Sequence, residues 1–242
     1  MPTNLPYIPE TITVHLGEPD QQAENVTVPF VDYIKNVASS EIYPTWPESA
    51  LRANILAQIS FALNRVYTEY YPSRGYSFNI TNSTAIDQSF INGRNYFDTV
   101  SLIVDEIFND YLRKRGRIEP LFAQYCNGTT VTCDGLSQWG SVDLAEEGYD
   151  SVEIIRHYYG DDTEVVVDAP VSGIMSSPPS RLLRFGSTGN DVLAVQLQLN
   201  RISVNYPSIP KIPSPDGYYG IGTKEAVEEF QSIFDLTVDG IV

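Results

Sequence analysis

The sequence predicts two domains, an α+β domain in which helices pack on a small mixed sheet, and then a small all-α domain. Two observations support this prediction. Apolar residues with helix spacing and with strand spacing alternate through the first two thirds of the chain. A Ser-, Pro- and Gly-rich stretch then follows, which cannot bury much apolar surface. We expect domains at 1–170 and 182–242, joined by a linker at 171–181.

Composition limits the function classes that are open to this chain. It has 242 residues, of which 42% are hydrophobic, and a formal net charge of −16. This charge disfavours tight binding to nucleic acid or to an anionic membrane. No apolar run approaches the roughly 18 residues of a membrane-spanning helix. The start of the chain lacks the basic and apolar regions of a signal peptide. We therefore expect no nucleic-acid partner and no membrane span, and we identify no signal peptide in this chain.

The first half of the α+β domain should contain one strand and two helices. Residues 10–16 alternate apolar and polar side chains, which predicts a half-buried strand. Residues 28–40 predict a short helix. Residues 45–71 carry apolar side chains at spacings of three and four, which predicts a long core helix. Thr45 and Glu48 would form a capping box at its start.

The second half of this domain should continue the mixed pattern. The basic cluster at 113–117 is interpreted as a helix end, where the helix dipole favours cations. We expect a helix over 96–115, a strand over 119–125, helices within 141–148 and 151–160, and a strand over 163–170.

The all-α domain is expected to contain capped helices within 183–202 and 222–236, separated by a Pro-rich loop at 205–220. A unit of this size has a small core. We expect it to be only marginally stable alone.

The segments "LRFGSTGNDVLAVQLQLN", "DGYYGIGTKEAVEEFQ" and "LTVDGIV" closely resemble the type-1 peptidoglycan-binding family. Members are three-helix domains carried by many cell-wall hydrolases, and the resemblance covers nearly all of 182–242. The family pattern usually continues with a Gly and a Thr-Trp, so we expect this domain to be truncated at its C-terminal end. The resemblance implies peptidoglycan as the partner and the cell wall or spore envelope as the location.

The first domain resembles, more distantly, the stage II sporulation protein D family. Three blocks carry the resemblance: "VPFVDYIKNVASSEIYPTWPESALRANILAQISFAL", then "AIDQSFING" with "EPLFAQYCNG", and then "GLSQWGSVDLAEEGYDSVEIIRHYYGDDTEV". They span most of 28–165. Members are lytic transglycosylases that cleave the glycan strands of peptidoglycan. The family's acid/base glutamate matches Glu41 in "ASSEIYP".

Glu41 would need a raised pKa to act as an acid at neutral pH. It follows the predicted end of a helix, where the dipole disfavours negative charge, and Ile42, Tyr43 and Trp46 could shield it from water. The alternative is that Glu41 is a solvated residue at a helix end. Composition alone favours that alternative, whereas the family resemblance favours catalysis.

Further residues match the polar and aromatic motif positions of the same family. Amides and aromatic rings suit a sugar, because hydroxyls need hydrogen-bond partners and C–H faces pack on rings. For Gln88 and Gln138 the alternative, that they satisfy buried backbone groups, remains equally open, and we expect Trp139 to fill the core. The predicted substrate-binding residues are Tyr43, Trp46, Gln88, Ser137 and Gln138.

We predict no metal and no cofactor. Some family members bind zinc through Cys and His before the "SQ-aromatic-G" motif, but "CNGTTVTCDGLSQWGS" contains no histidine. Two cysteines with Asp134 would be a poor zinc set. We therefore expect Cys126 and Cys133 to form a disulfide or to remain two free thiols.

Two functions of different classes follow. The first is a glycan-strand lytic transglycosylase that uses Glu41 as acid and base and is anchored by the C-terminal domain. The second is a non-catalytic protein that binds peptidoglycan or the spore wall and retains a degenerate first domain.

Overall fold

The computed structural model describes residues 6–172, 181–203 and 205–242. They divide into two compact units, Met1–Val171 and Ser172–Val242, which are described separately below. The predicted fold classes are confirmed, because unit 1 mixes helices and small sheets and the regular elements of unit 2 are α-helices. Most of the expected linker, residues 173–180, lies outside the described residues.

Unit 1 contains three small sheets rather than one. The first has the order β2-β1-β3, with β2 antiparallel and β3 parallel to β1. The others are the antiparallel pair β4-β7 and the parallel pair β5-β6. The strands are β1 (Thr11–His15), β2 (Asn25–Pro29), β3 (Ile80–Thr81), β4 (Tyr111–Lys114), β5 (Tyr125–Cys126), β6 (Leu136–Ser137) and β7 (Thr163–Val166).

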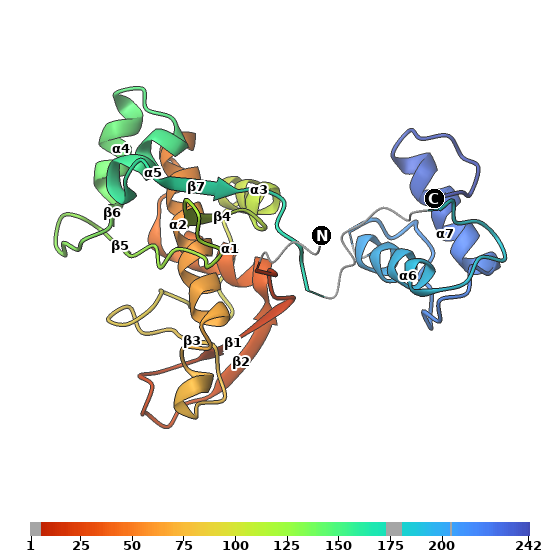
Figure 1. Ribbon diagram of the computed structural model, residues 1–242, viewed down its shortest axis with the longest axis horizontal. Helices are drawn as coiled ribbons and strands as arrows, with labels where there is room; N and C mark the ends of the chain where they lie inside the picture. Colours follow the sequence, from red (N-terminus) through yellow and green to blue (C-terminus); the bar gives the residue numbers. More distant parts are fainter. Residues whose placement is uncertain (1–5, 173–180, 204) are drawn as a thin grey trace. The chain divides into compact units, whose positions relative to one another are not determined.

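One long helix, α2 (Glu48–Tyr67), is the centre of unit 1. It is buried on almost every side and contacts α1, α3, α4 and α5 as well as β3 and β4. Figure 1 shows the β2-β1-β3 sheet at one end of α2 and helices α4 and α5 at the other. The remaining helices of unit 1 are α1 (Phe30–Glu41), α3 (Asp98–Ile107), α4 (Gln138–Glu146) and α5 (Ser151–Tyr159), with a 3₁₀ turn at Pro72–Arg74.

The helix expected over 96–115 is wrong in its second half. Helix α3 ends at Ile107, and the basic cluster lies in β4 and the following turn. Pairing with β7 explains the difference, because it places Glu164 against Arg113 and Arg115 as cross-strand ion pairs. Tertiary pairing thus overrides the helical spacing of this segment.

Two smaller expectations also fail. The capping box of Thr45 and Glu48 does not form, because Pro47 is the N-cap residue of α2 and Glu48 pairs with Arg52 one turn later. The strand expected over 119–125 is reduced to the two residues of β5. In addition, β2 was not anticipated as a strand, although it forms the five-residue antiparallel partner of β1.

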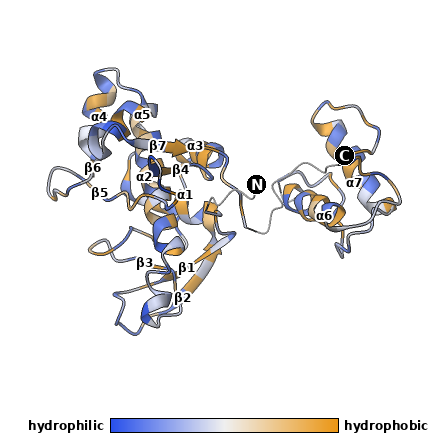
Figure 2. Cartoon of the chain, viewed as in Figure 1, coloured by the Kyte–Doolittle hydropathy of each residue, from blue (hydrophilic) through white to orange (hydrophobic). Residues whose placement is uncertain are grey.

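Unit 2 contains α6 (Asn190–Ile202) and α7 (Ile221–Ile233). Figure 2 shows hydrophobic and hydrophilic residues interleaved along both helices, as expected of amphipathic helices. The described residues of this unit therefore contain two of the three helices that the resemblance implies. Its buried core consists of Leu183, Val192, Leu199, Ile209, Ile212, Tyr219, Ala226 and Val227.

A buried glutamine on each helix of unit 2 holds one Asp-Gly turn. Gln196 accepts hydrogen bonds from the backbone N–H groups of Asp216 and Gly217. Gln231 accepts them in the same way from the residues at 239–240. The two amides also donate to groups in or near the turns. Unit 2 therefore fixes its irregular segments with polar side chains, which compensates for its small core.

Asp87 and Arg65 form a buried ion pair that joins a loop of unit 1 to α2. The Arg65 Nε donates to Asp87 Oδ1 at 2.9 Å, and the Asp87 side chain is fully buried. The second Asp87 oxygen accepts from Tyr71 Oη at 2.6 Å and from the backbone N–H and hydroxyl of Thr81. All of these donors face one carboxylate, so the loop beginning at Asp87 has a fixed position.

We expect Asp87→Asn to destabilise unit 1 by about 3 kcal/mol or more, because the buried Arg65 guanidinium loses its counter-charge. Urea unfolding followed by tryptophan fluorescence measures this, since both tryptophans, Trp46 and Trp139, lie in unit 1. The matched control is Asp105→Asn, which removes the surface pair with Lys35 and should cost less than about 1 kcal/mol. Equal effects of the two variants would contradict the assignment.

Candidate functional site

Glu41 is the last residue of α1, and the local sequence explains why the helix stops there. The buried face of α1 includes Phe30, Tyr33, Ile34 and Val37, at helical spacing. After Glu41 the backbone turns extended, and two prolines within the next six residues prevent continuation of the helix. The carboxyl therefore projects from the junction between α1 and α2.

The carboxyl group of Glu41 lies among hydrogen-bond donors from three segments. The backbone N–H of Ser89 donates to Oε1 at 2.8 Å, and Nε2 of Gln58 donates to Oε2 at 2.8 Å. The hydroxyl of Tyr125 also interacts with this carboxyl, and hydrogen bonding from it lowers the pKa of Glu41. The residue as a whole is partly exposed, whereas its carboxyl group is buried and held by these protein donors.

Behind these donors lies a second layer of fully buried polar groups. Gln88 donates from Nε2 to the Tyr125 hydroxyl at 2.9 Å and to the backbone carbonyl of Gln58 at 3.1 Å. Its Oε1 accepts a hydrogen bond from the hydroxyl of Tyr33. We therefore assign Gln88 to the buried network around Glu41 rather than to a surface that touches substrate, because its side chain is 0% exposed.

Burial raises the pKa of Glu41 from its ordinary value of 4.5 to about 7. Hydrogen bonds from Ser89, Tyr125 and Gln58 oppose this effect, because they stabilise the carboxylate. Burial also raises the pKa of Tyr125 well above 10, so its hydroxyl stays neutral. At neutral pH both protonation states of Glu41 are populated, as a group that donates and accepts protons requires.

Three aromatic side chains form a cluster, and two of them, Tyr43 and Trp46, belong to the segment that directly follows Glu41. The rings of Trp46 and Trp139 lie 5.0 Å apart, and that of Tyr43 lies 5.7 Å and 5.9 Å from them. The expectation that Trp139 fills the core is wrong, because it is 41% exposed and Tyr43 is 58% exposed. Trp46 is nearly buried and supports the other two. This aromatic cluster presents the rings of Tyr43 and Trp139 to solvent, and Tyr43 belongs to the segment that directly follows Glu41.

A cleft of about 320 Å³ adjoins the cluster at Trp46. It lies between the first turn of α2 and helix α3, and the exposed Leu102 is part of its apolar lining. Arg52 lies in this cleft between the carboxylates of Glu48 and Glu106. Trp46 is thus shared between the aromatic cluster and the cleft.

Ser137 and Gln138 hold the start of α4 rather than the carboxyl. The Ser137 hydroxyl caps the helix by accepting from the N–H of Gly140 at 2.9 Å. Gln138 is 6% exposed, and its backbone carbonyl accepts from the hydroxyl of Ser141. Their direct effect is to orient the helix that carries Trp139.

A disulfide closes the loop that leads into this helix. Cys126 and Cys133 are bonded to one another, and Cys126 pairs with Ser137 across β5 and β6. Gly128 must be glycine there, because a Cβ would lie 1.8 Å from Ser137 Oγ and its φ is +79°. The disulfide follows directly after Tyr125, so the loop, the start of α4 and the Glu41 network are coupled.

Sequence reasoning missed Gln58, Ser89 and Tyr125 as neighbours of Glu41. Ser89 acts through its backbone, which no side-chain pattern reveals. Gln58 did leave a signal, since it is an uncharged polar residue inside an otherwise apolar stretch of a buried helix. Tyr125 lies in the predicted strand over 119–125 and in the block "EPLFAQYCNG", neither of which indicates a role beside Glu41.

The described residues contain no group of three or more His, Cys, Asp or Glu side chains placed to hold a metal ion. His15 is buried in β1, where it stacks on Phe78 and bonds Asn25. His157 lies on α5, beside a pocket near the disulfide. Neither histidine contacts Glu41.

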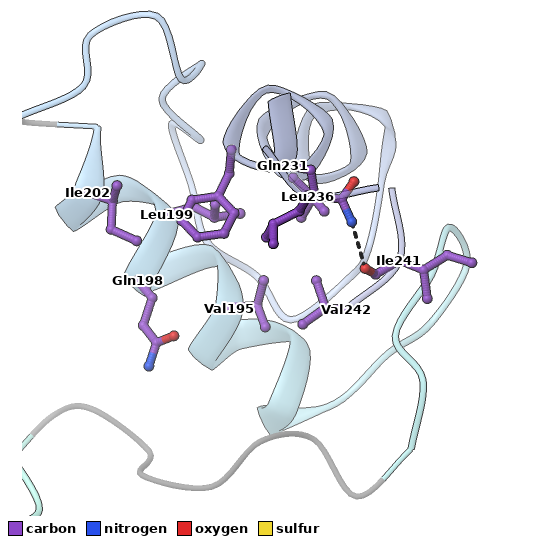
Figure 3. Close-up of a pocket in the computed structure, with 10 residues that line it drawn as sticks. Val195, Gln198, Leu199, Ile202, Gln231, Leu236, Ile241 and Val242 are labelled. Atoms are coloured by element: carbon purple, nitrogen blue, oxygen red, sulfur yellow. Dashed lines mark hydrogen bonds between the residues drawn. The ribbon is translucent and has the colours of Figure 1, made fainter. Parts of the chain in front are cut away.

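Unit 2 has an apolar pocket of about 250 Å³ between α6 and α7 (Figure 3). Val195, Leu199 and Ile202 approach it from α6, and the last residues of the chain line it from another side. The amide of Gln231 donates to the carbonyl of Ile241 at 2.9 Å and holds this wall in place.

Comparison with known proteins finds a family match within unit 2. Residues 188–242 match the family described as "Putative peptidoglycan binding domain". No curated protein matches the chain. Among solved structures, the chain is similar to that of "The crystal structure of SleB N-terminal domain", with 30% identity over 27% of this chain and 82% of that chain, and a TM-score of 0.23.

The family match supports a cell-wall-associated protein that binds peptidoglycan through unit 2. Within the part of the chain that the structure describes, no helix is both long enough and apolar enough to cross a membrane.

The raised pKa of Glu41 predicts a pH-dependent effect of Glu41→Gln on stability. Below about pH 4.5 the carboxyl is protonated in both the folded and the unfolded chain. As the pH rises from 4.5 to about 7, Glu41 ionises in the unfolded chain while it is still largely protonated in the folded chain. The free energy of unfolding of the wild type therefore falls by up to about 3 kcal/mol, whereas that of the variant does not fall for this reason. Urea unfolding at pH 4.5 and 8, followed by tryptophan fluorescence, measures the difference.

The matched control for this prediction is Glu147→Gln. Glu147 also lies at a helix C-terminus, but it is exposed, so its removal should have nearly the same effect at both pH values. A stability difference for Glu41→Gln that does not change with pH would show that the carboxyl is solvated.

Proposed function

We propose that this protein is a lytic transglycosylase of peptidoglycan glycan strands, with Glu41 as the acid and base and unit 2 as the anchor on the polymer. The observation that carries the proposal is the position of Glu41. Its carboxyl has a pKa of about 7 in a residue that is partly exposed as a whole, and the segment that directly follows it contributes Tyr43 and Trp46 to an aromatic cluster with exposed rings. The resemblance of residues 28–165 to the stage II sporulation protein D family supports the same assignment.

A single carboxyl group can complete this reaction. The protonated Glu41 gives its proton to the glycosidic oxygen as the bond from that oxygen to C1 breaks. The C6 hydroxyl of the same sugar then attacks C1, and the Glu41 carboxylate takes the hydroxyl proton. The product is a 1,6-anhydro sugar, and Glu41 returns to its acid form. A hydrolase would instead use two carboxyl groups flanking the bond.

The neighbouring groups would perform distinct tasks in this reaction. Ser89 and Tyr125 stabilise the carboxylate through hydrogen bonds. The rings of Tyr43 and Trp139 can pack against the C–H faces of sugar residues, with Trp46 as their support. The adjoining cleft between α2 and α3 could accommodate a substituent of the bound strand.

Unit 2 would act by keeping unit 1 close to its substrate. Two sites joined by a short segment convert the second binding event into an intramolecular one. This raises the local concentration of glycan strands around Glu41 without changing the reaction. An immobilised polymer such as the cell wall is a substrate for which this arrangement is effective.

We expect Glu41→Gln to lower the rate of anhydro-sugar formation by at least about 100-fold, because the acid and base are lost together. Mass spectrometry of purified glycan strands after incubation with the protein measures the products. Glu147→Gln serves as the control and should retain wild-type activity. Binding to insoluble peptidoglycan should be unchanged in both variants. Binding without product from wild type would instead support the non-catalytic wall-binding function.

We expect Trp139→Ala to weaken binding of glycan fragments to unit 1 by about tenfold, through loss of a ring face. Its effect should appear mainly in KM, because the residue does not contact Glu41. Ile118→Ala is the control, since Ile118 is 44% exposed, has no aromatic face and lies outside the cleft. If the two substitutions change KM equally, the aromatic cluster has no specific role.

A further inference from the structure

Two of the three donors around Glu41 have fixed orientations. The N–H of Ser89 is a backbone group and can only donate. The Tyr125 hydroxyl receives a hydrogen bond from Gln88, so its own hydrogen is directed elsewhere. Gln88 cannot reverse its amide, because its Nε2 also faces the backbone carbonyl of Gln58, which accepts only.

The third donor, the side chain of Gln58, has no such constraint. Its Nε2 contacts Glu41 Oε2, and its Oε1 is buried without a hydrogen-bond partner among the described residues. An amide has nearly the same shape when its oxygen and nitrogen exchange places. Only Glu41 therefore determines which end of the Gln58 amide faces it.

The region behind the amide can receive the reversed nitrogen. Asn54 lies one turn earlier on α2, and its Oδ1 is also buried without a partner among the described residues. Side chains four residues apart on a helix are neighbours. An NH₂ group turned away from Glu41 thus finds an acceptor on the same face of α2.

We propose that Gln58 is a positioning residue whose side-chain amide reverses with the protonation state of Glu41. Facing the carboxylate, Nε2 donates to Oε2. Facing the carboxylic acid, Oε1 accepts the acid hydrogen. This proposal rests on the proposed function, in which Glu41 acts first as an acid and then as a base.

The remaining groups around Glu41 do not compete for this role. From the β5 side the facing group is Tyr125, and behind it lies Tyr33 on α1; both phenols have pKa values raised well above 10 and stay neutral. From the loop before Ser89, Asp87 is already paired with Arg65 on α2. The proton that titrates near neutral pH is therefore that of Glu41.

The arrangement also determines which oxygen carries the proton. Oε1 faces the Ser89 N–H and cannot hold a hydrogen pointing at it, so the acid hydrogen lies on Oε2. Gln58 holds this hydrogen until the glycosidic oxygen takes it. Once the proton has left, the amide turns back, and Nε2 donates to the carboxylate that then accepts the C6 hydroxyl proton.

Nuclear magnetic resonance of the full chain tests the proposal without any substrate. In protein labelled at Glu ¹³Cδ and Gln ¹⁵Nε2, the Glu41 carboxyl is assigned with Glu41→Gln. We expect the Gln58 amide signal to titrate with the same midpoint as Glu41, and its hydrogen bond to the carboxyl to be lost on acidification. An amide that keeps this bond at both ends of the titration would overturn the proposal.

The variant Gln58→Met provides a second test. An amide that only donates would stabilise the carboxylate alone, so its removal would raise the Glu41 pKa by about one unit or more. An amide that serves both states should give a shift below about half a unit. The control is Asn64→Leu, which removes an amide of α2 that bonds Pro120 and not Glu41.

These measurements separate the inference from the proposed function. Coupled titration without anhydro products would leave the Gln58 assignment intact and reject the transglycosylase. Anhydro products, together with a Glu41 pKa that rises by about one unit in Gln58→Met, would support the transglycosylase and reject the Gln58 assignment. If Gln58→Met does not fold, the wild-type titration still decides.

Discussion

Burying the carboxyl group of one partly exposed residue, Glu41, is the constraint on which the rest of unit 1 depends. Without partners, a buried carboxylate would cost more free energy than the fold could offset. Hydrogen bonds from a backbone N–H, an amide and a phenol reduce that cost, and the pKa of Glu41 settles at about 7. Each of these donors is in turn held by a separate element of unit 1. The position of Glu41 is therefore a property of the whole unit.

This dependence explains why structural residues far from the carboxyl matter. Asp87 is locked to α2 by Arg65, and this fixes the loop that supplies the Ser89 N–H. The disulfide between Cys126 and Cys133 closes the loop directly after Tyr125. Both features restrict segments that would otherwise lose their contact with Glu41. The site is thus preorganised by an ion pair on one side and by a covalent bond on the other.

Sequence patterns predicted the parts of this arrangement that depend on local periodicity. The helix ending at Glu41 and the long helix after it follow from apolar spacing and from the prolines between them. The network around Glu41 depends on contacts between distant segments, such as that of Gln58 with the carboxyl and that of Gln88 with Tyr125. A single sequence carries no record of those contacts. For the same reason the helical spacing of residues 96–115 predicts a helix where the structure has the strand β4, because pairing with β7 determines the conformation there.

The exposure of Trp139 shows how the same limitation affects the surface of the site. A tryptophan in a Gly-rich motif is reasonably expected to be buried, because its area makes exposure unfavourable. Here Ser137 caps α4 and directs the indole outward, where it meets Tyr43 and Trp46. The two exposed rings, those of Tyr43 and Trp139, could hold a rigid polymer only weakly, since stacking contributes about 1 kcal/mol per ring. An anchoring unit that binds the same polymer makes such weak contacts sufficient, because it keeps the strand near the rings after each dissociation.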